Sequence, residues 1–448
     1  MSYGTRSRRE REEIPLKVLI VRIGAMGDVL HGLPAAAALR ARLPNCEIGW
    51  AVEPKWSPLL VDETGSGPAV TRIHTVPTRE WKRRPLSFKT LREVVTLRRE
   101  IRQQEYDLCI DLQGAIKSAL VGRMAAAKHY LGPQKPRERQ ARALYGIRVD
   151  IRSRHVIEQA CEMAKAALSA LVEDYQQVEA LAPVKVELPV DATAERWCDR
   201  TLDELGVGED GFVLLAPSAG WGAKQWQPWR YAKVAKHLTE AGHRVLVNAV
   251  ADVDEAAINE ITQAGDAVRV DSDIAQLVSL MRRAKLVLGG DTGPVHLAAA
   301  LGRPVVALYG PTDPGRNGPF FVGAKVRVIR SPTSRVDYAR YQQIEAGLAT
   351  VTEDEVLASA LQLLEVDSAE RPEFKPQPDP EALVLEQVKD GFGTEAFASA
   401  TTWKTSAFRT DMLQLELQRI EAEKAEAEEK AKAEAEKSQE PGAGKTDG

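Results

Sequence analysis

The stretch Asp291-Thr292-Gly293-Pro294-Val295-His296 follows directly on an apolar run, Leu286-Val287-Leu288-Gly289-Gly290. This pattern predicts a buried strand that ends in two glycines and a helix that begins at once. The first N–H groups of such a helix have no partner within the helix, and the helix dipole adds positive charge there, so the position suits a diphosphate. Asp291 or Thr292 can cap the helix, Gly293 lets a ligand approach the backbone, and His296 lies one turn further on. An ordinary capped turn between a strand and a helix would show the same motif.

A second turn of this kind lies near the N-terminus. The apolar strand Lys17 to Arg22 leads into Ile23-Gly24-Ala25-Met26-Gly27-Asp28 and then into the helical run Val29 to Leu43. Asp28 stands where an N-cap would stand, and capping alone would explain it. The glycines do not form the G-x-G-x-x-G fingerprint of dinucleotide-binding dehydrogenases. Two such turns in separate halves of the chain predict an α/β protein with two Rossmann-like domains, with ligands at the carboxyl edges of both sheets.

Strands and helices alternate through both halves, as in parallel sheets. The predicted strands are 17–21, 47–52, 72–76, 108–112 and 128–131 in the first half, and 212–216, 244–248, 268–271, 286–289 and 305–309 in the second. Thr352-Glu353-Asp354-Glu355 fits a capping box that opens a last helix, to about Leu364. With 448 residues and a 44% hydrophobic fraction, the chain is long enough for two or three domains with real cores.

The composition predicts four segments. They are a polar N-terminal tail (1–15), an N-terminal Rossmann-like domain (16–182), a second Rossmann-like domain (183–365), and a proline-rich linker with a charged helical or disordered tail (366–448). We predict for the tail nothing beyond a solvating role or an unidentified partner.

The charge is unevenly distributed. The whole chain has a formal net charge of only −4, yet residues 79–154 contain 19 lysines and arginines against 8 aspartates and glutamates. A basic face of this kind can meet phosphate groups of a lipid surface or of nucleic acid, or it can be a solvated helical face without a partner. We predict contact with an anionic membrane surface and no nucleic-acid partner.

The four cysteines are scattered, with neither a C-x-x-C pair nor neighbouring histidines, so they predict no disulfide framework and no zinc site. No run of about 18 apolar residues occurs, so we expect a cytoplasmic protein with at most peripheral membrane contact. Asp252-Val253-Asp254 and Asp271-Ser272-Asp273 resemble the metal-binding D-x-D of some sugar transferases, but we expect the first to open a helix and the second to close a strand.

A third loop can bear on chemistry. The strand Leu214 to Ala216 runs into Pro217-Ser218-Ala219-Gly220, with Lys224 and Trp226 shortly after. A lysine at this edge can stabilise negative charge that develops on a phosphate, although an exposed loop lysine fits the same spacing.

Several stretches together resemble the lipopolysaccharide heptosyltransferases, glycosyltransferase family 9. They are Ile23-Gly24-Ala25-Met26-Gly27-Asp28-Val29-Leu30-His31, Asp111-Leu112-Gln113-Gly114 with Lys117-Ser118, Lys224 with Trp226, Asp291 to Leu297, and Tyr309-Gly310-Pro311-Thr312-Asp313-Pro314. The resemblance runs from about residue 16 to 365, in family order. Val52-Glu53 and the basic middle region are most like the enzyme that adds the first heptose, heptosyltransferase I.

The resemblance implies a GT-B fold and metal-independent, inverting transfer of heptose from ADP-heptose to the Kdo region of lipopolysaccharide, with no cofactor. It implies that Asp28 is the general base and that Lys224, together with the backbone N–H groups of Thr292 and Gly293, stabilises the departing ADP. His296 would support the donor pocket. The other implied contacts are Gly27, Ser218, Asp252 and Asp291 to the donor, and Arg22, Gln113 and Lys117 to the lipid A–Kdo acceptor.

Two departures from the family pattern are visible. The family usually has a proline directly after the tryptophan of the lysine motif, whereas here Gln227 separates Trp226 from Pro228. The family also tends to have a glycine turn near the ribose of the donor, and Asn248-Ala249-Val250-Ala251 lacks those glycines. The alternatives are therefore a family relative with another nucleotide sugar or acceptor, a GT-B nucleotide-sugar epimerase, and a non-catalytic nucleotide-sugar binding protein.

Overall fold

The computed structural model describes residues 15–85, 87–171, 181–208, 211–249, 255–337 and 341–368. Residues 1–14 of the predicted N-terminal tail, residues 369–448 of the predicted C-terminal extension and Asp252 lie outside these residues.

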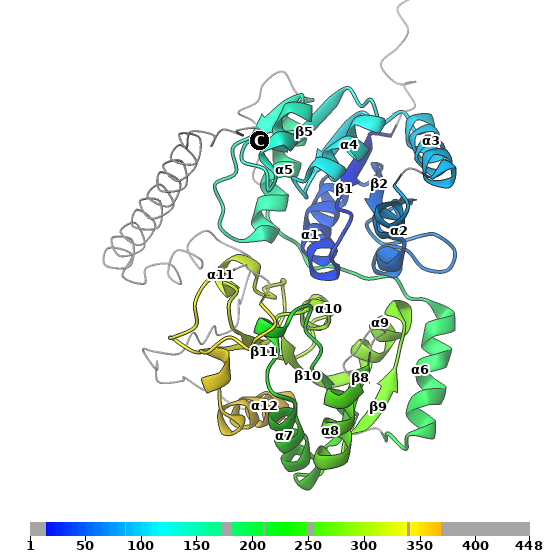
Figure 1. The fold of residues 1–448 in the computed structure, drawn as a ribbon. Coiled ribbons are helices and arrows are strands. Elements are labelled where there is room, and N and C mark those ends of the chain that lie inside the picture. The colour runs from blue at the N-terminus through cyan, green and yellow to red at the C-terminus, as the bar shows by residue number, and fades with distance from the viewer. Residues whose placement is uncertain are drawn as a thin grey trace, which may run out of the picture. The chain divides into compact units, whose positions relative to one another are not determined.

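The first half forms a six-stranded parallel sheet with helices on both faces (Figure 1). Its strands lie in the order β3-β2-β1-β4-β5-β6. They are β1 (Lys17–Val21), β2 (Glu47–Val52), β3 (Arg72–Thr75), β4 (Leu108–Asp111), β5 (His129–Pro133) and β6 (Ile147–Val149). The helices are α1 (Met26–Arg42), α2 (Thr78–Arg83), α3 (Phe88–Gln103), α4 (Ile116–Met124) and α5 (Val156–Ser169). Since the order reverses between β1 and β4, the carboxyl ends of these two strands mark the expected ligand edge.

The second half repeats this plan. Its parallel sheet has the order β12-β11-β10-β7-β8-β9. The strands are β7 (Phe212–Ala216), β8 (Arg244–Ala249), β9 (Val268–Asp271), β10 (Ala284–Gly290), β11 (Val305–Tyr309) and β12 (Val326–Arg330). The helices are α6 (Ala192–Glu204), α7 (Pro228–Glu240), α8 (Glu255–Gly265), α9 (Ile274–Arg283), α10 (Gly293–Ala300), α11 (Pro314–Asn317) and α12 (Glu353–Ser368). Here the order reverses between β7 and β10, so the loops after these strands mark the second ligand edge.

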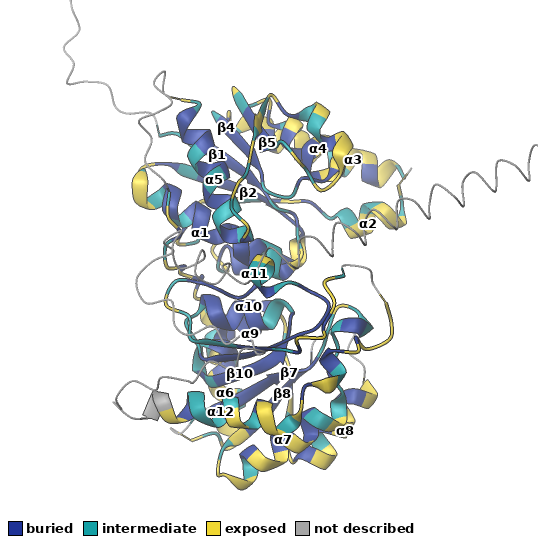
Figure 2. Cartoon of the chain, turned by 90° about the vertical axis from the view of Figure 1, so that its left-hand side faces the viewer, coloured by how far each residue is buried: buried dark blue, intermediate teal, exposed yellow. Residues whose placement is uncertain are grey.

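Continuous apolar runs explain the central strands, since helices cover both faces of a parallel sheet. Every residue of β7 and β11 is buried, as are all four residues of β4 (Figure 2). Exposed residues gather on the outer sides of helices such as α3, α7 and α8. The four cysteines are all buried and free, so they contribute to the core as small apolar side chains.

The ten predicted strands are all present, with ends shifted by at most two residues. The structure adds β6 and β12, which are short edge strands with mixed burial and therefore lack a continuous apolar run. It also adds α6, which Asp191 caps by accepting from the Ala194 N–H at 2.8 Å. The predicted capping position Thr352 accepts from the Glu355 N–H at 3.3 Å at the start of α12.

The predicted N-cap position of Asp28 was wrong. Helix α1 begins at Met26 with Ala25 as its N-cap, and Asp28 is the third residue of the helix. Its Oδ2 reaches back to accept from the Ala25 N–H at 3.1 Å, which satisfies an N–H that the helix itself leaves unpaired. The carboxylate is therefore fixed at the start of α1, next to the carboxyl end of β1.

Among the described residues, no helix has both the length and the apolar character needed to cross a bilayer.

Candidate functional site

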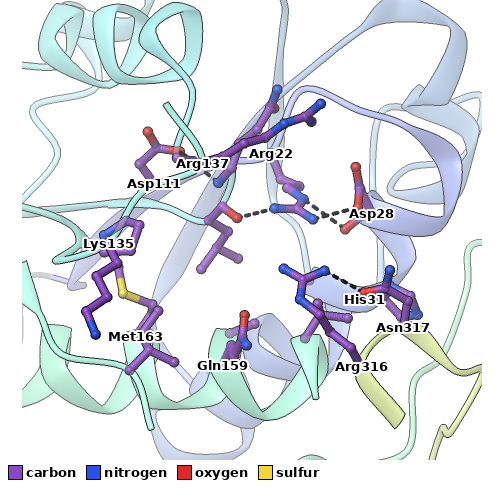
Figure 3. Close-up of a pocket in the computed structure, with 18 of the residues that line it drawn as sticks. Arg22, Asp28, His31, Asp111, Lys135, Arg137, Gln159, Met163, Arg316 and Asn317 are labelled. Carbon is purple, nitrogen blue, oxygen red and sulfur yellow. Dashed lines mark hydrogen bonds and ion pairs between the residues drawn. The ribbon is translucent and has the colours of Figure 1, made fainter. Parts of the chain in front are cut away.

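A cavity of about 620 Å³ lies at the ligand edges of both sheets (Figure 3). Residues from α1 and from the loops after β1, β4 and β5 line it, together with residues from α5, from the loop after β7 and from the segment around α11. They include Arg22, Asp28, His31, Asp111, Gln113, Lys135, Arg137, Gln159, Met163, Trp221, Lys224, Thr312, Arg316 and Asn317. The cavity thus brings together Asp28 and Lys224, which are far apart in the sequence.

Asp28 is held in place by Arg22. The Arg22 Nη2 donates to Asp28 Oδ1 at 2.7 Å, and its Nε donates to the Asp28 carbonyl oxygen at 3.2 Å. The same guanidinium also donates to the carbonyl oxygen of Leu112 after β4 (Figure 3). The Arg22 Nη2 and the Ala25 N–H therefore orient the Asp28 carboxylate. Because the Asp28 side chain is 40% exposed and lines the cavity, the carboxylate is still accessible from it.

The loop after β4 is organised by Asp111, which is completely buried. Its carboxylate accepts from the N–H groups of Gln113 and Gly114 and from the hydroxyls of Ser118 and Tyr145. Burial raises the pKa of Asp111, although these four hydrogen bonds act in the opposite direction. The turn places the Gln113 side chain so that its Oε1 accepts from the Ile23 N–H at 2.8 Å, which ties the two ligand-edge loops together.

On the other sheet, Lys224 forms a buried ion pair with Asp291. Its Nζ donates to the Asp291 carbonyl oxygen at 3.3 Å and also to Oδ2. Asp291 additionally accepts from the Thr312 hydroxyl at 2.6 Å and from His296 Nε2 at 3.1 Å. Burial alone would raise the pKa of Asp291, but the His296 hydrogen bond and the charge of Lys224 outweigh it and hold that pKa well below its usual range.

His296 acts behind Asp291 and does not line the cavity. Its ring is buried and packs edge-to-face against His31 at 4.6 Å between centroids. Burial, followed by the nearby His296, His155 and Arg22, lowers the pKa of His31 well below the ordinary value, so His31 is neutral at physiological pH.

The two predicted donor glycines have a packing role. A Cβ at Gly293 would lie 2.4 Å from the sulfur of Met26, and a Cβ at Gly27 would lie 3.0 Å from the His296 ring. Neither glycine lines the cavity. The absence of side chains at these two positions lets the N-termini of α1 and α10 approach closely.

The other predicted residues are placed as follows. Arg22 and Gln113 line the cavity, whereas Lys117 does not; its Nζ lies 3.4 Å from the Thr78 hydroxyl. Ser218 and Thr292 are half-buried in the loops after β7 and β10 but do not line the cavity. Thr292 is the N-cap residue of α10, although its side chain makes no capping hydrogen bond and Asp291 makes none either.

The second D-x-D motif has structural partners. Asp271 pairs with Arg269 at 2.8 Å, and Asp273 caps α9 by accepting from the Gln276 N–H at 2.9 Å. Asp271 ends strand β9, as the sequence predicts, and both carboxylates have partners within the protein. The first motif includes Asp252 and lies outside the described residues.

Sequence reasoning missed a group of cavity residues that is mostly cationic. Lys135, Arg137 and Arg316 join Arg22 and Lys224 around the cavity, as Figure 3 shows for four of these side chains. Lys135 and Arg137 belong to the basic region that we assigned to a membrane surface. Their position shows that part of this basic charge faces the cavity instead.

The model of glycosyltransferase family 9 (heptosyltransferase) matches residues 94–348. Lipopolysaccharide heptosyltransferase 1 of Escherichia coli is 30% identical over 348 residues, which cover 75% of this chain and 100% of that protein. Lipopolysaccharide heptosyltransferase 2 of the same species is 28% identical over 336 residues, covering 70% of this chain and 88% of that protein.

Solved structures agree on the fold. The E. coli heptosyltransferase WaaC, solved with ADP-2-deoxy-2-fluoro heptose, has a TM-score of 0.59 at 24% identity and covers 79% of this chain and 100% of its own. The family 9 glycosyltransferase from Veillonella parvula has a TM-score of 0.65 at 18% identity, covering 78% of this chain and 98% of its own.

The GT-B fold and the resemblance predicted from the sequence motifs are thereby confirmed, as is the expectation of a glycosyltransferase. The chain belongs to glycosyltransferase family 9, the heptosyltransferase family.

Proposed function

We propose that this chain is an inverting, metal-independent enzyme that transfers heptose from ADP-heptose to a Kdo residue of the lipopolysaccharide inner core. The observation that carries the proposal is the shared cavity of Asp28 and Lys224, in a chain of the heptosyltransferase family and surrounded by further cations. The named heptosyltransferase 1 relatives support the acceptor, and the ADP-sugar analogue bound to WaaC supports the donor.

Asp28 would act as the general base. The acceptor hydroxyl oxygen attacks the anomeric carbon of the heptose from the side opposite to ADP, its proton passes to the Asp28 carboxylate, and the bond from that carbon to the diphosphate oxygen breaks. The electron pair of that bond leaves with ADP, so the configuration at the carbon inverts. A carboxylate is a weak base towards an alcohol, and most proton transfer would occur as the oxygen becomes acidic in the transition state. Arg22 and the Ala25 N–H would keep the carboxylate in position.

Lys224 would stabilise the diphosphate as it leaves. An ammonium group has three N–H donors, and the Asp291 carboxylate and carbonyl take two of them. The third is available for a phosphate oxygen in the cavity, and the N-terminus of α10 adds positive potential. His296 and Thr312 would act through Asp291, while Gly27, Ser218, Asp252, Thr292 and Gly293 stay proposed donor contacts.

The acceptor would be held by its negative charge. Kdo carries a carboxylate at neutral pH, and arginine and lysine are the usual partners of such groups. Lys135, Arg137 and Arg316 line the cavity, so we add them to the predicted acceptor residues Arg22, Gln113 and Lys117. We also propose the domain boundaries at residues 16–182 and 183–365, and a cytoplasmic location on the inner face of the inner membrane.

The test is to incubate the purified chain with ADP-heptose and EDTA, with and without a deacylated Kdo acceptor. We expect ADP release that depends on the acceptor, and a product whose anomeric configuration, measured by NMR, is opposite to that of the donor. Conversion of the nucleotide sugar without acceptor would indicate an epimerase. Binding of ADP-heptose without turnover would indicate another acceptor or a binding protein, and turnover only with a different nucleotide sugar would correct the donor.

A further inference from the structure

Helix α3 exposes an apolar stripe to solvent. Phe88 is 82% exposed, Leu91 60% and Val95 50%. Spacings of three, four and seven residues place these side chains on one face of a helix. Leu97 and Ile101, which face the core, are buried on the opposite side. Large apolar side chains grouped in this way on an outer surface indicate a contact with something else.

Cations share this face. Arg92 lies four residues after Phe88 and Arg99 lies four residues after Val95, and both are exposed. Neither forms an ion pair with any described residue. The acidic Glu93 faces α2 instead, where it accepts from the Trp81 indole N–H at 2.9 Å and pairs with Arg84 at 3.3 Å. The exposed face of α3 is therefore both apolar and positively charged.

Helix α4, which packs against α3, extends this surface. Leu120 is 50% exposed and Ile116 is 37% exposed, one helical turn apart. Helix α4 begins two residues after Gly114, which lines the cavity. Yellow segments on α3 and α4 in Figure 2 mark exposed residues of these two helices. We call Phe88, Leu91, Arg92, Val95, Arg99, Ile116 and Leu120 the α3–α4 face.

We propose that the α3–α4 face docks on an anionic lipid bilayer. Its apolar side chains would enter the boundary between headgroups and acyl chains, and Arg92 and Arg99 would meet lipid phosphates. Interleaved arginines that have no acidic partner among the described residues complement an anionic headgroup layer, which is why a bilayer fits better than an apolar protein groove. The proposal rests on the proposed function, because docking would serve transfer to a lipid-anchored acceptor. Such an acceptor would then enter the cavity beside α4.

The first test is sedimentation of the full chain with vesicles of phosphatidylglycerol and phosphatidylethanolamine, against vesicles of phosphatidylcholine alone. We expect binding to the anionic vesicles that weakens about tenfold or more in Phe88→Ser/Leu91→Ser and in Arg92→Glu/Arg99→Glu. Matched controls are Val190→Ser/Val336→Ser, exposed apolar residues elsewhere, and Arg200→Glu/Lys236→Glu, exposed cations of the second half. The controls should bind like the parent chain. Equal loss in variants and controls, or no loss in the variants, would overturn the proposal.

The second test locates the contact. All four native cysteines are buried, so a polarity-sensitive dye can be attached at Leu91→Cys, with Val190→Cys as control. We expect a blue shift on adding anionic vesicles at position 91 only. A dye that is shielded before vesicles are added and does not respond to them would show that the chain's own tail, a second copy or another protein covers this face, and would overturn the proposal.

Turnover of a water-soluble, deacylated acceptor separates this inference from the proposed function. The variant Phe88→Ser/Leu91→Ser should turn it over at the parental rate. If no variant or parent turns over any acceptor, the proposed function fails while the vesicle result still decides the docking surface.

Discussion

Lys224 and Asp291 form an ion pair across the two ligand-edge loops of the second sheet, one from the loop after β7 and the other directly after β10. Their side chains are only 15% and 5% exposed. The pair therefore has two consequences: it satisfies a buried carboxylate, and it fixes the ammonium group at the cavity wall.

A substitution pair separates these consequences. Lys224→Met leaves Asp291 buried without its cation, so we expect the free energy of unfolding to fall by about 3–5 kcal/mol and kcat to fall about 10²–10³-fold. Lys224→Met/Asp291→Asn removes the stranded charge, so urea unfolding should show most of the stability regained while kcat stays low. Recovery of kcat together with stability would mean that Lys224 has only a structural role.

Stability should depend on pH through His155. Its Nε2 donates to the Gly318 carbonyl oxygen at 3.0 Å and its Nδ1 accepts from the Ile157 N–H at 3.3 Å, which requires the neutral ring. Burial lowers the pKa of His155 to about 4, from an unfolded value of about 6.5. Between these values the unfolded chain binds the proton and the folded chain does not, so stability falls as pH falls.

The expected loss for this one residue is about 3 kcal/mol between pH 7 and pH 4. Urea unfolding across this range measures it. His155→Gln should have a lower free energy of unfolding at pH 7, and this free energy should depend less steeply on pH. Some dependence should remain, because burial also lowers the pKa of His74 to about 4. An unchanged slope in His155→Gln would contradict the assignment.

The cavity cations should act on the acceptor. Arg137→Ala and Arg316→Ala each remove one charged donor from the cavity, so we expect the acceptor KM to rise about tenfold. ADP affinity, measured by calorimetry, should stay the same for Arg137→Ala. Arg139→Ala is the matched control, an exposed arginine two residues away that does not line the cavity. A rise in KM equal to that of the control would place the acceptor elsewhere.

The sequence predicted much of this fold because its central strands are buried on both faces and must be continuously apolar. The loops after β1 and β10 were also recognisable, because each is a glycine turn that directly follows a continuously apolar strand. The pairing of Lys224 with Asp291 was out of reach, because it depends on the spatial order of β7 and β10. The packing role of Gly293 gave no signal either, because a Cβ there would meet Met26 of the other half, which only the assembled fold brings close. Arg316 gave no signal, because only the assembled fold brings it to the cavity.

The central claim is that Asp28 takes the proton from the acceptor. The direct measurement is acceptor-dependent ADP release in the presence of EDTA for the parent chain, Asp28→Asn and Asp107→Asn, a carboxylate paired with Lys128 away from the cavity. We predict that Asp28→Asn lowers kcat about 10²–10⁴-fold while ADP-heptose binding persists, and that Asp107→Asn keeps the parental rate. Turnover of Asp28→Asn at the parental rate would contradict the account.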